Sequence, residues 1–392
     1  MNANVTTCDV AVVGLGIFGS ATTHALVRRG ARVVGIEAHG PIHRFGSSYG
    51  ESRIFRRAYW EGTNYLPLLN RAHELWVQLE EAHESPLLLR TGGVFAGTTS
   101  SGVVELSKKT AEAGGIEHEV LTAGELNSRF PWFDIGDDMA AIYEPDAYAV
   151  LAERARLAML DQAVTAGASL RFGDAVVDIG PSRNTVTLEL RSGETIACGA
   201  VVLALGPWMK NHLTTGLSRI LQPVRVPVYW FRTSRSLGAE RFPSFLYETA
   251  AGEVIYGVTE GGPDRDIVKI GFHNRQQRPW DPQDRSETEV PREYLDEIHA
   301  VVSRIFKGVV PEPVGGRYCY YTLTPDTSFI VDRSPAHAGI VHISACSGHG
   351  FKFAPAIGEC AAEMVLGLPG GVDVTPFRAD RFAPGAVPMP NC

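Results

Sequence analysis

The sequence lacks the features that mark several large protein classes. None of its six cysteines forms a CxxC pair, so zinc-ribbon and thioredoxin-like proteins are excluded and no metal site is predicted. No apolar run approaches membrane-spanning length and the first residues begin no signal peptide, so we expect a cytoplasmic protein without a membrane partner. The absence of a dense lysine and arginine run, with a net charge of −8, argues against nucleic-acid binding.

What remains is an ordinary globular composition. The chain has 392 residues, of which 44% are hydrophobic and 20% are charged, as is typical of a soluble enzyme. That length suffices for two domains or for one large domain with an insertion.

The first 37 residues carry the most informative pattern. A buried strand, a glycine turn, a helix and a second strand are expected in turn over residues 10–13, 14–19, 20–29 and 32–36. Gly14 permits the tight turn, Gly16 lets a pyrophosphate approach the backbone, and Gly19 lets helix and strand pack closely. Glu37 ends the second strand, where its carboxylate can accept hydrogen bonds from a ribose.

This pattern predicts a dinucleotide site, with the pyrophosphate at the N-terminus of the helix. It does not separate FAD from NAD. The residues after Glu37, Ala38-His39-Gly40, offer no arginine for a 2′-phosphate, which disfavours NADP.

The rest of the chain predicts an α/β protein of two domains. Buried strands and amphipathic helices continue the first sheet, whereas alternating strand patterns dominate residues 220–318 and predict a second sheet. The α/β pattern returns after residue 329, so the nucleotide domain is expected to be discontinuous. We assign it residues 1–85, 145–215 and 320–392, and the substrate domain residues 86–144 and 216–319.

Five sequence blocks are similar to one family. They lie in the expected order along the chain, at residues 14–20, 50–56, 269–273, 319–322 and 347–353. The chain thereby resembles monomeric sarcosine oxidase and N-methyltryptophan oxidase, members of the D-amino-acid-oxidase-like flavoproteins with a glutathione-reductase-type, Rossmann-like FAD domain. The resemblance implies a monomeric FAD enzyme that oxidises a secondary amine to an imine and passes the electrons to O2, giving hydrogen peroxide.

The resemblance also assigns cofactor-binding positions. Cys319 matches the cysteine that carries the flavin through a thioether to its 8α-methyl carbon. The other positions expected to contact FAD are Gly14, Gly16, Ile17, Phe18, Gly19, Glu37, Ser47, Ser52, Arg53, Val176, Trp208, Gly348, His349, Gly350 and Lys352.

The substrate and the reaction are assigned in the same way. Arg56 and Lys352 match the pair that holds the substrate carboxylate, and a guanidinium with an ammonium suits that anion chemically. Lys269 matches the lysine that promotes the reaction of reduced flavin with oxygen. Further residues expected around flavin and substrate are Arg53, His273, Tyr256 and Tyr321.

Three departures from the family pattern leave the substrate open. Ser48-Tyr49 replaces a usual histidine pair, Tyr247 replaces a methionine over the substrate, and Tyr148 replaces a glycine. These aromatic residues predict a reshaped pocket, so larger N-methyl amino acids, or cyclic ones such as proline or pipecolate, compete with sarcosine.

Three other functions compete with an oxidase. A flavin dehydrogenase would pass electrons to an acceptor other than oxygen. An NAD-dependent hydroxy-acid dehydrogenase would share the nucleotide motif, and a non-catalytic flavin-binding subunit would not need Arg56, Lys352 and Lys269.

Overall fold

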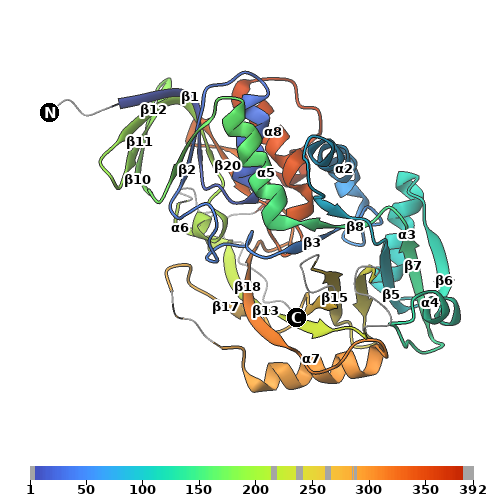
Figure 1. The fold of residues 1–392 in the computed structure, drawn as a ribbon. Helices are drawn as coiled ribbons and strands as arrows, with labels where there is room; N and C mark the ends of the chain where they lie inside the picture. Colours follow the sequence, from blue (N-terminus) through green and yellow to red (C-terminus); the bar gives the residue numbers. More distant parts are fainter. Residues whose placement is uncertain are drawn as a thin grey trace.

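Two large sheets, one above the other in Figure 1, organise the molecule. A computed structural model describes residues 5–212, 219–234, 242–260, 266–284, 286 and 289–382. In this part of the chain no helix is long and apolar enough to cross a membrane.

The upper sheet has eight strands in the described residues and contains the predicted nucleotide motif. Strand β1 lies at its centre, between β12 and β2, with both pairings parallel. β2 pairs in parallel with β9, and β12 pairs in parallel with β20. The strands are β1 (Val5–Val13), β2 (Val33–Glu37), β9 (Ser169–Phe172), β10 (Val176–Ser182), β11 (Thr185–Leu190), β12 (Thr195–Leu203), β19 (Ile330–Ser334) and β20 (His337–Ser344).

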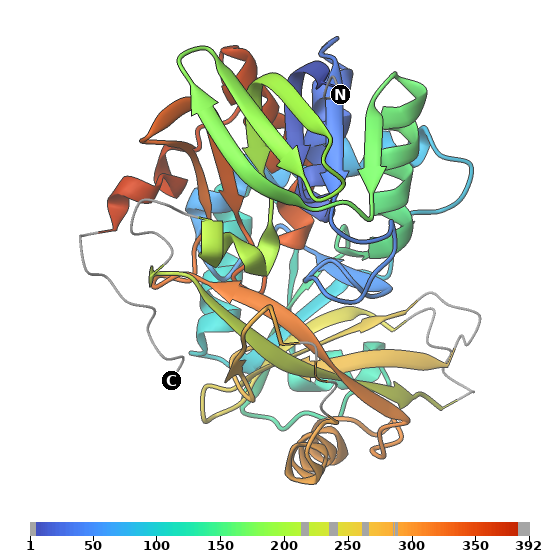
Figure 2. The same cartoon turned by 90° about the vertical axis from the view of Figure 1, so that its left-hand side faces the viewer.

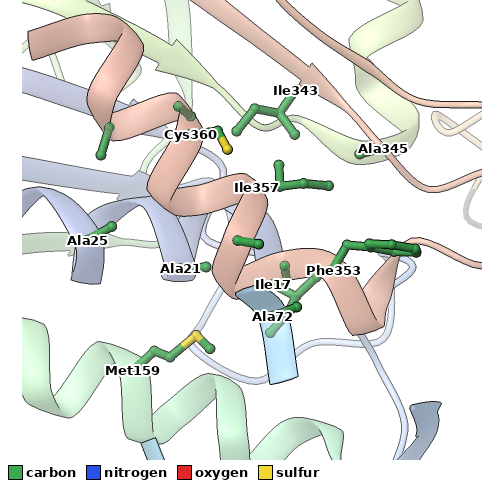
Figure 3. Close-up of a cluster of buried hydrophobic side chains, with 14 of the residues drawn as sticks. Ile17, Ala21, Ala25, Ala72, Met159, Ile343, Ala345, Phe353, Ile357 and Cys360 are labelled. Atoms are coloured by element: carbon green, nitrogen blue, oxygen red, sulfur yellow. The ribbon is translucent and has the colours of Figure 1, made fainter. Parts of the chain in front are cut away.

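Helices cover this sheet and bury its apolar residues. They are α1 (Ile17–Val27), α2 (Leu66–Glu81), α5 (Ala152–Thr165) and α8 (Ala354–Leu366). Figure 3 shows α8 crossing close to α1 at Ala21, with Ile357 and Cys360 of α8 directed toward Ile343. A Cβ at Gly358 of α8 would lie 2.6 Å from the backbone of Ala21. Small residues at this crossing let the helices approach closely.

The lower sheet has nine strands in the described residues and is mainly antiparallel (Figure 2). Helix α7 (Arg292–Ile305) packs on its face away from the upper sheet (Figure 1). The strands are β5 (Gly93–Thr98), β6 (Glu119–Thr122), β7 (Met139–Glu144), β13 (Gln222–Arg232), β14 (Ser244–Glu248), β15 (Val254–Thr259), β16 (Ile267–Phe272), β17 (Arg278–Pro279) and β18 (Gly315–Leu323).

Shorter elements join the two layers. Three strands form a small sheet: β3 (Ser52–Phe55), β4 (Leu88–Leu89) and β8 (Tyr148–Leu151). The remaining helical elements are η1 (Thr63–Tyr65), α3 (Gly102–Gly114), α4 (Ala123–Arg129), η2 (Gly206–Trp208), α6 (Met209–His212), η5 (Phe351–Phe353), η6 (Thr375–Phe377) and η7 (Ala379–Arg381).

The two sheets draw their strands from alternating stretches of the chain. The lower sheet uses strands within residues 93–144 and 222–323, and the upper sheet uses the stretches before, between and after them. Strand β18 crosses the domain boundary predicted at residue 320, because its pairing with β13 continues from Gly315 to Leu323. This arrangement leaves Cys319 in the lower sheet and residues 347–353 beside the upper one.

Candidate active site

An elongated cavity of about 520 Å³ lies between the two sheets. One end is lined by the glycine turn, Glu37 and Val176, and the other by Arg56, His273 and Lys352. The cavity therefore joins the predicted nucleotide site to the predicted substrate site.

The glycine turn has the geometry that the sequence pattern requires. Gly14 has a φ of +88°, a conformation that disfavours other residues. A side chain at Gly19 would place its Cβ 1.8 Å from the carbonyl oxygen of Gly14, so only glycine lets α1 start this close to β1. The N-cap of α1, Gly16, lines the cavity, so an anion could bind at this helix end, where the Ile17 amide now donates a hydrogen bond to Ser48 Oγ at 2.9 Å.

Glu37 is buried at the end of β2 and faces this turn. Its Oε2 accepts a hydrogen bond from the Leu15 amide at 2.9 Å, and its Oε1 accepts one from the His39 amide at 3.0 Å. Burial alone would raise the pKa of Glu37, but His43 and the two amides outweigh burial and lower it. The carboxylate is therefore ionised and positioned to accept further hydrogen bonds.

Most predicted cofactor residues line this one cavity. Gly19 does not, because it acts in the packing of α1 on β1. The lining positions are Gly14, Gly16, Ile17, Phe18, Glu37, Ser47, Ser52, Arg53, Val176, Trp208, Cys319, Gly348, His349, Gly350 and Lys352.

The chemistry of these positions fits FAD. The glycine turn and Glu37 suit a pyrophosphate and a ribose, and they lie at one end of the elongated cavity. Cys319, half-buried on β18, lies farther along with its Sγ 3.9 Å from Nη2 of Arg53. When bound, FAD would accept two electrons from a substrate placed beside its ring system.

Arg56 is buried and already has a carboxylate partner. Its Nη2 donates hydrogen bonds to both oxygens of Glu61, at 2.8 and 2.7 Å, and its guanidinium stacks over the Tyr59 ring at 4.4 Å. Burial opposes ionisation of Glu61, but Arg56, and after it His349 and Lys352, lower its pKa to about 2. Arg56 is thus paired with an internal carboxylate in this structure, and its contact with a substrate carboxylate stays a prediction.

Lys352 lies beside this ion pair at the start of η5. Its Nζ donates a hydrogen bond to the His349 carbonyl at 2.6 Å. Burial and, after it, the positive charge of Arg56 lower the pKa of Lys352 to about 7, although Glu61 opposes the shift. A further anion at this position would favour the protonated lysine.

Lys269 on β16 points into the cavity and is also paired. Its Nζ donates to the carbonyl and the hydroxyl of Ser52, at 2.7 and 3.1 Å, and lies 2.8 Å from Oε1 of Glu260. Lys269 keeps Glu260 ionised, lowering its pKa to about 2 against the effect of burial. The sequence pattern places the Ser52 hydroxyl near the pyrophosphate of FAD, but in this structure that hydroxyl is bonded to Lys269 and Glu260.

Aromatic residues surround the space between these cations. His273 lies near Trp60 and Tyr321, with ring centroids 6.3 and 6.1 Å away, and burial lowers its pKa to about 4. Tyr256 faces the cavity from β15, next to Leu246 of the paired strand. His273 is therefore neutral, and this part of the cavity is mostly apolar.

The other predicted histidine, His349, has both ring nitrogens engaged. Its Nδ1 lies 2.6 Å from the Tyr59 hydroxyl and its Nε2 lies 2.9 Å from the Thr327 carbonyl. These contacts fix the His349 ring, and with it the glycine turn, between Tyr59 and the backbone at Thr327.

Two of the expected aromatic substitutions lie outside the cavity. Tyr247 points to the opposite face of β14, into the core beside α7, and its hydroxyl lies 4.0 Å from Sδ of Met139. Leu246 takes its place, because side chains alternate along a strand. Tyr148 is buried behind β3 and stacks on Phe55 with centroids 4.5 Å apart. Neither tyrosine reshapes the pocket as predicted.

Four residues of the site were missed by sequence reasoning. Trp60 and Leu246 line the cavity, and Glu61 and Glu260 pair with its cations. Glu61 and Trp60 could have been predicted from the sequence, since both lie within five residues of Arg56. Glu260 follows β15 directly, and only the pairing of β15 with β16 brings it to Lys269.

Comparison with known proteins shows the family of the chain. A family model described as FAD dependent oxidoreductase matches residues 9–364. The chain is 34% identical over 379 residues to N-methyl-L-tryptophan oxidase of Salmonella dublin, covering 96% of this chain and 99% of that one. It has the same identity and coverage with that oxidase of Salmonella typhimurium.

Solved structures share the fold at lower identity. NikD, described as an unusual amino acid oxidase essential for nikkomycin biosynthesis, is similar with a TM-score of 0.82 at 23% identity, covering 95% of this chain and 97% of that one. Glycine oxidase from Geobacillus kaustophilus is similar with a TM-score of 0.79 at 20% identity, covering 96% of this chain and all of that one.

Proposed function

The chain belongs to the FAD-dependent oxidoreductase family, and from that premise we propose that it oxidises the secondary amine of an N-methyl or cyclic amino acid with O2 as the electron acceptor. The full-length similarity to N-methyl-L-tryptophan oxidases supports this substrate class. The products are hydrogen peroxide and an imine, which water can then hydrolyse.

The observation that carries the proposal is the pair of buried cations at one end of the cavity. Arg56 and Lys352 both face this space, and Lys352 is poised between its two protonation states. A substrate carboxylate suits both groups, because a guanidinium binds it through two hydrogen bonds and an ammonium adds a point charge. Because Glu61 neutralises only one of the two cations, an amine without a carboxylate would leave the second one without a counter-ion.

The walls around the cations support an apolar substrate side chain. Trp60, Leu246 and Tyr256 supply apolar surface, and His273 is neutral. These four residues offer no counter-charge to a cationic side chain, and the nearby Glu61 is already paired with Arg56. We therefore expect N-methyl amino acids with apolar side chains, or cyclic imino acids, to be better substrates than N-methyl amino acids with basic side chains.

The proposed mechanism assigns a task to each group. Arg56 and Lys352 fix the carboxylate, so that the carbon bound to nitrogen lies in one position. The buried site favours the neutral amine, which needs no protein base to lose a hydride equivalent. Lys269 supplies positive charge where oxygen is reduced, and Cys319 is proposed to hold the flavin through a thioether.

A peroxide-coupled screen of N-methyl and cyclic amino acids tests this function. We expect peroxide formation with at least one substrate that carries a carboxylate, and little with the matching amine that lacks it. Substrate-dependent reduction of the flavin, with slow reoxidation in air and turnover restored by an artificial dye, would instead identify a dehydrogenase.

A further inference from the structure

The ammonium of Lys269 has no uncommitted proton in this structure. Its three nearest acceptors are the Ser52 carbonyl, the Ser52 hydroxyl and Oε1 of Glu260. An ammonium has three N–H donors, so all three are engaged. Lys269 and Glu260 together carry no net charge, and both side chains are about 95% buried or more. A proton that leaves Lys269 must therefore be replaced through one of these contacts.

Glu260 connects this lysine to a second carboxyl group. Its Oε1 receives the hydrogen bonds from Ser52 and Lys269, whereas its buried Oε2 has no other partner among the described residues. The carboxyl group of Glu51 lies within hydrogen-bonding reach of Glu260. Two carboxyl groups can bond to each other only if one carries a proton.

Lys269, Glu260 and Glu51 thus form a row, and Glu51 is its outer member. It is exposed at the surface, does not line the cavity, and precedes β3, whose first residue is Ser52. The groups around it have opposing effects. Glu260 and burial raise the pKa of Glu51 to about 7, while Arg317 and Lys269 oppose the shift. Glu51 can therefore take a proton from water near neutral pH, and its contact with Glu260 leads that proton inward.

The reaction proposed above consumes one proton in the cavity. Transfer of two electrons and one proton from reduced flavin to O2 gives the hydroperoxide anion, HO2⁻. This anion must accept a second proton to leave as H2O2. Lys269 is the one cation of the row that lines the cavity.

We infer that Glu51, Glu260 and Lys269 form a proton-delivery line from solvent to the site of oxygen reduction. Nζ of Lys269 releases one of its three contacts and gives that proton to HO2⁻. Glu260 then returns a proton to Nζ, and Glu51 passes one from water to Glu260. The charge on each residue is restored after one proton has moved along the row. This inference rests on the proposed oxidase function.

The test compares Glu51→Gln with a control, Glu253→Gln. Glu253 is an acid of the neighbouring β14–β15 hairpin whose partner is Arg275. Anaerobic reduction by substrate should be unchanged in both variants. Reoxidation by O2 should slow at least about tenfold in Glu51→Gln, since a general acid typically contributes a hundredfold or more. The solvent isotope effect on reoxidation should be larger in this variant, and the rate should no longer depend on pH near pH 7. Formic acid or imidazolium should restore the rate.

A static readout accompanies the kinetics. The infrared band of a protonated carboxyl group should titrate near pH 7 in the oxidised wild-type enzyme without substrate and be absent in Glu51→Gln. Glu260→Gln tests the middle of the row, but it leaves Lys269 buried without a counter-ion, so Glu51→Gln is the decisive variant. Wild-type reoxidation rates in Glu51→Gln, with the wild type itself reacting rapidly with O2, would overturn the delivery line alone. A wild type that O2 does not reoxidise would overturn the proposed function and this inference with it.

Discussion

Arg56 binds Glu61 through two hydrogen bonds of 2.8 and 2.7 Å, in the same part of the cavity where a substrate carboxylate is expected. The internal acid satisfies a buried guanidinium that would otherwise be costly. It also competes with any external carboxylate for the same donors. The affinity for the substrate therefore depends on how much more strongly Arg56 binds the substrate carboxylate than it binds Glu61.

Substitutions at Arg56 and at Glu61 should change the affinity for a carboxylate in opposite directions. Arg56→Met should weaken the binding of a simple carboxylate such as propionate by about a hundredfold or more, the equivalent of about 3 kcal/mol. Glu61→Gln should strengthen it about tenfold, because the competing charge is removed, while lowering the melting temperature. Calorimetric titration measures both.

Arg57→Met is the matched control for these variants. Arg57 is the next residue along the chain, but its guanidinium binds Asp146 and does not line the cavity. Its loss should leave propionate binding unchanged. Equal weakening in the Arg56 and Arg57 variants would show that general electrostatics, and not a carboxylate site, controls binding.

Binding of a carboxylate should weaken as the pH rises through neutrality. Burial lowers the pKa of Lys352 to about 7, so the free protein loses the ammonium above that pH. The bound anion favours the protonated lysine, and binding then requires proton uptake. The Kd of propionate should be flat below about pH 7 and should rise by up to about tenfold per pH unit above it.

Titrations in buffers of different ionisation enthalpy check the proton uptake directly. Lys352→Met should bind propionate more weakly than the wild type at low pH, and its Kd should not rise with pH. A constant Kd between about pH 6 and about pH 9 in the wild type would mean that Lys352 does not change protonation on binding.

The flavin should be covalently attached through Cys319. Acid precipitation should leave the yellow colour in the protein pellet, and Cys319→Ala should release it into the supernatant. Cys346→Ala is the control, because Cys346 is a second cysteine that lines the same cavity. Free flavin in the wild-type supernatant, after expression with ample FAD, would argue against the thioether.

Loss of Lys269 should affect only one half of the catalytic cycle. Lys269→Met should slow reoxidation by O2 about a hundredfold to a thousandfold, the equivalent of about 3–4 kcal/mol of electrostatic stabilisation. Reduction by substrate should change much less, since the carboxylate contacts remain. Stopped-flow spectroscopy of the flavin absorbance follows both halves, and a wild-type rate of reoxidation would refute the role of Lys269.

The same substitution should reveal how tightly Lys269 and Glu260 are coupled. Lys269→Met leaves Glu260 buried without its partner, which typically costs about 3–5 kcal/mol of unfolding free energy. Adding Glu260→Gln should restore much of that loss. Chemical denaturation of the two single variants and the double variant gives the coupling energy, and additive losses would show that the ion pair contributes little.

Local patterns in the sequence were sufficient for much of the fold. The strand, glycine turn and helix at the N-terminus are determined by neighbours in sequence, since Gly14 and Gly19 act within a few residues of each other. Helical spacing of apolar residues over 65–81 also predicts a helix, and α2 spans Leu66–Glu81. Helix α1 begins at Ile17, earlier than expected, since the glycine turn is part of its first turn.

The placement of single side chains required the tertiary structure. Tyr247 was expected at the cavity, but its neighbour Leu246 lines it, because adjacent residues of a strand point to opposite faces. Glu260 and Lys269 meet because two strands pair, and Glu51 joins them from the residue that precedes β3. The sequence by itself determined the dinucleotide motif, because that motif depends on residue type and local spacing, and its resemblance to one family supplied FAD and the cations of the site. Only the packing of the two sheets decided which acids neutralise those cations, because contacts between distant segments leave no local pattern.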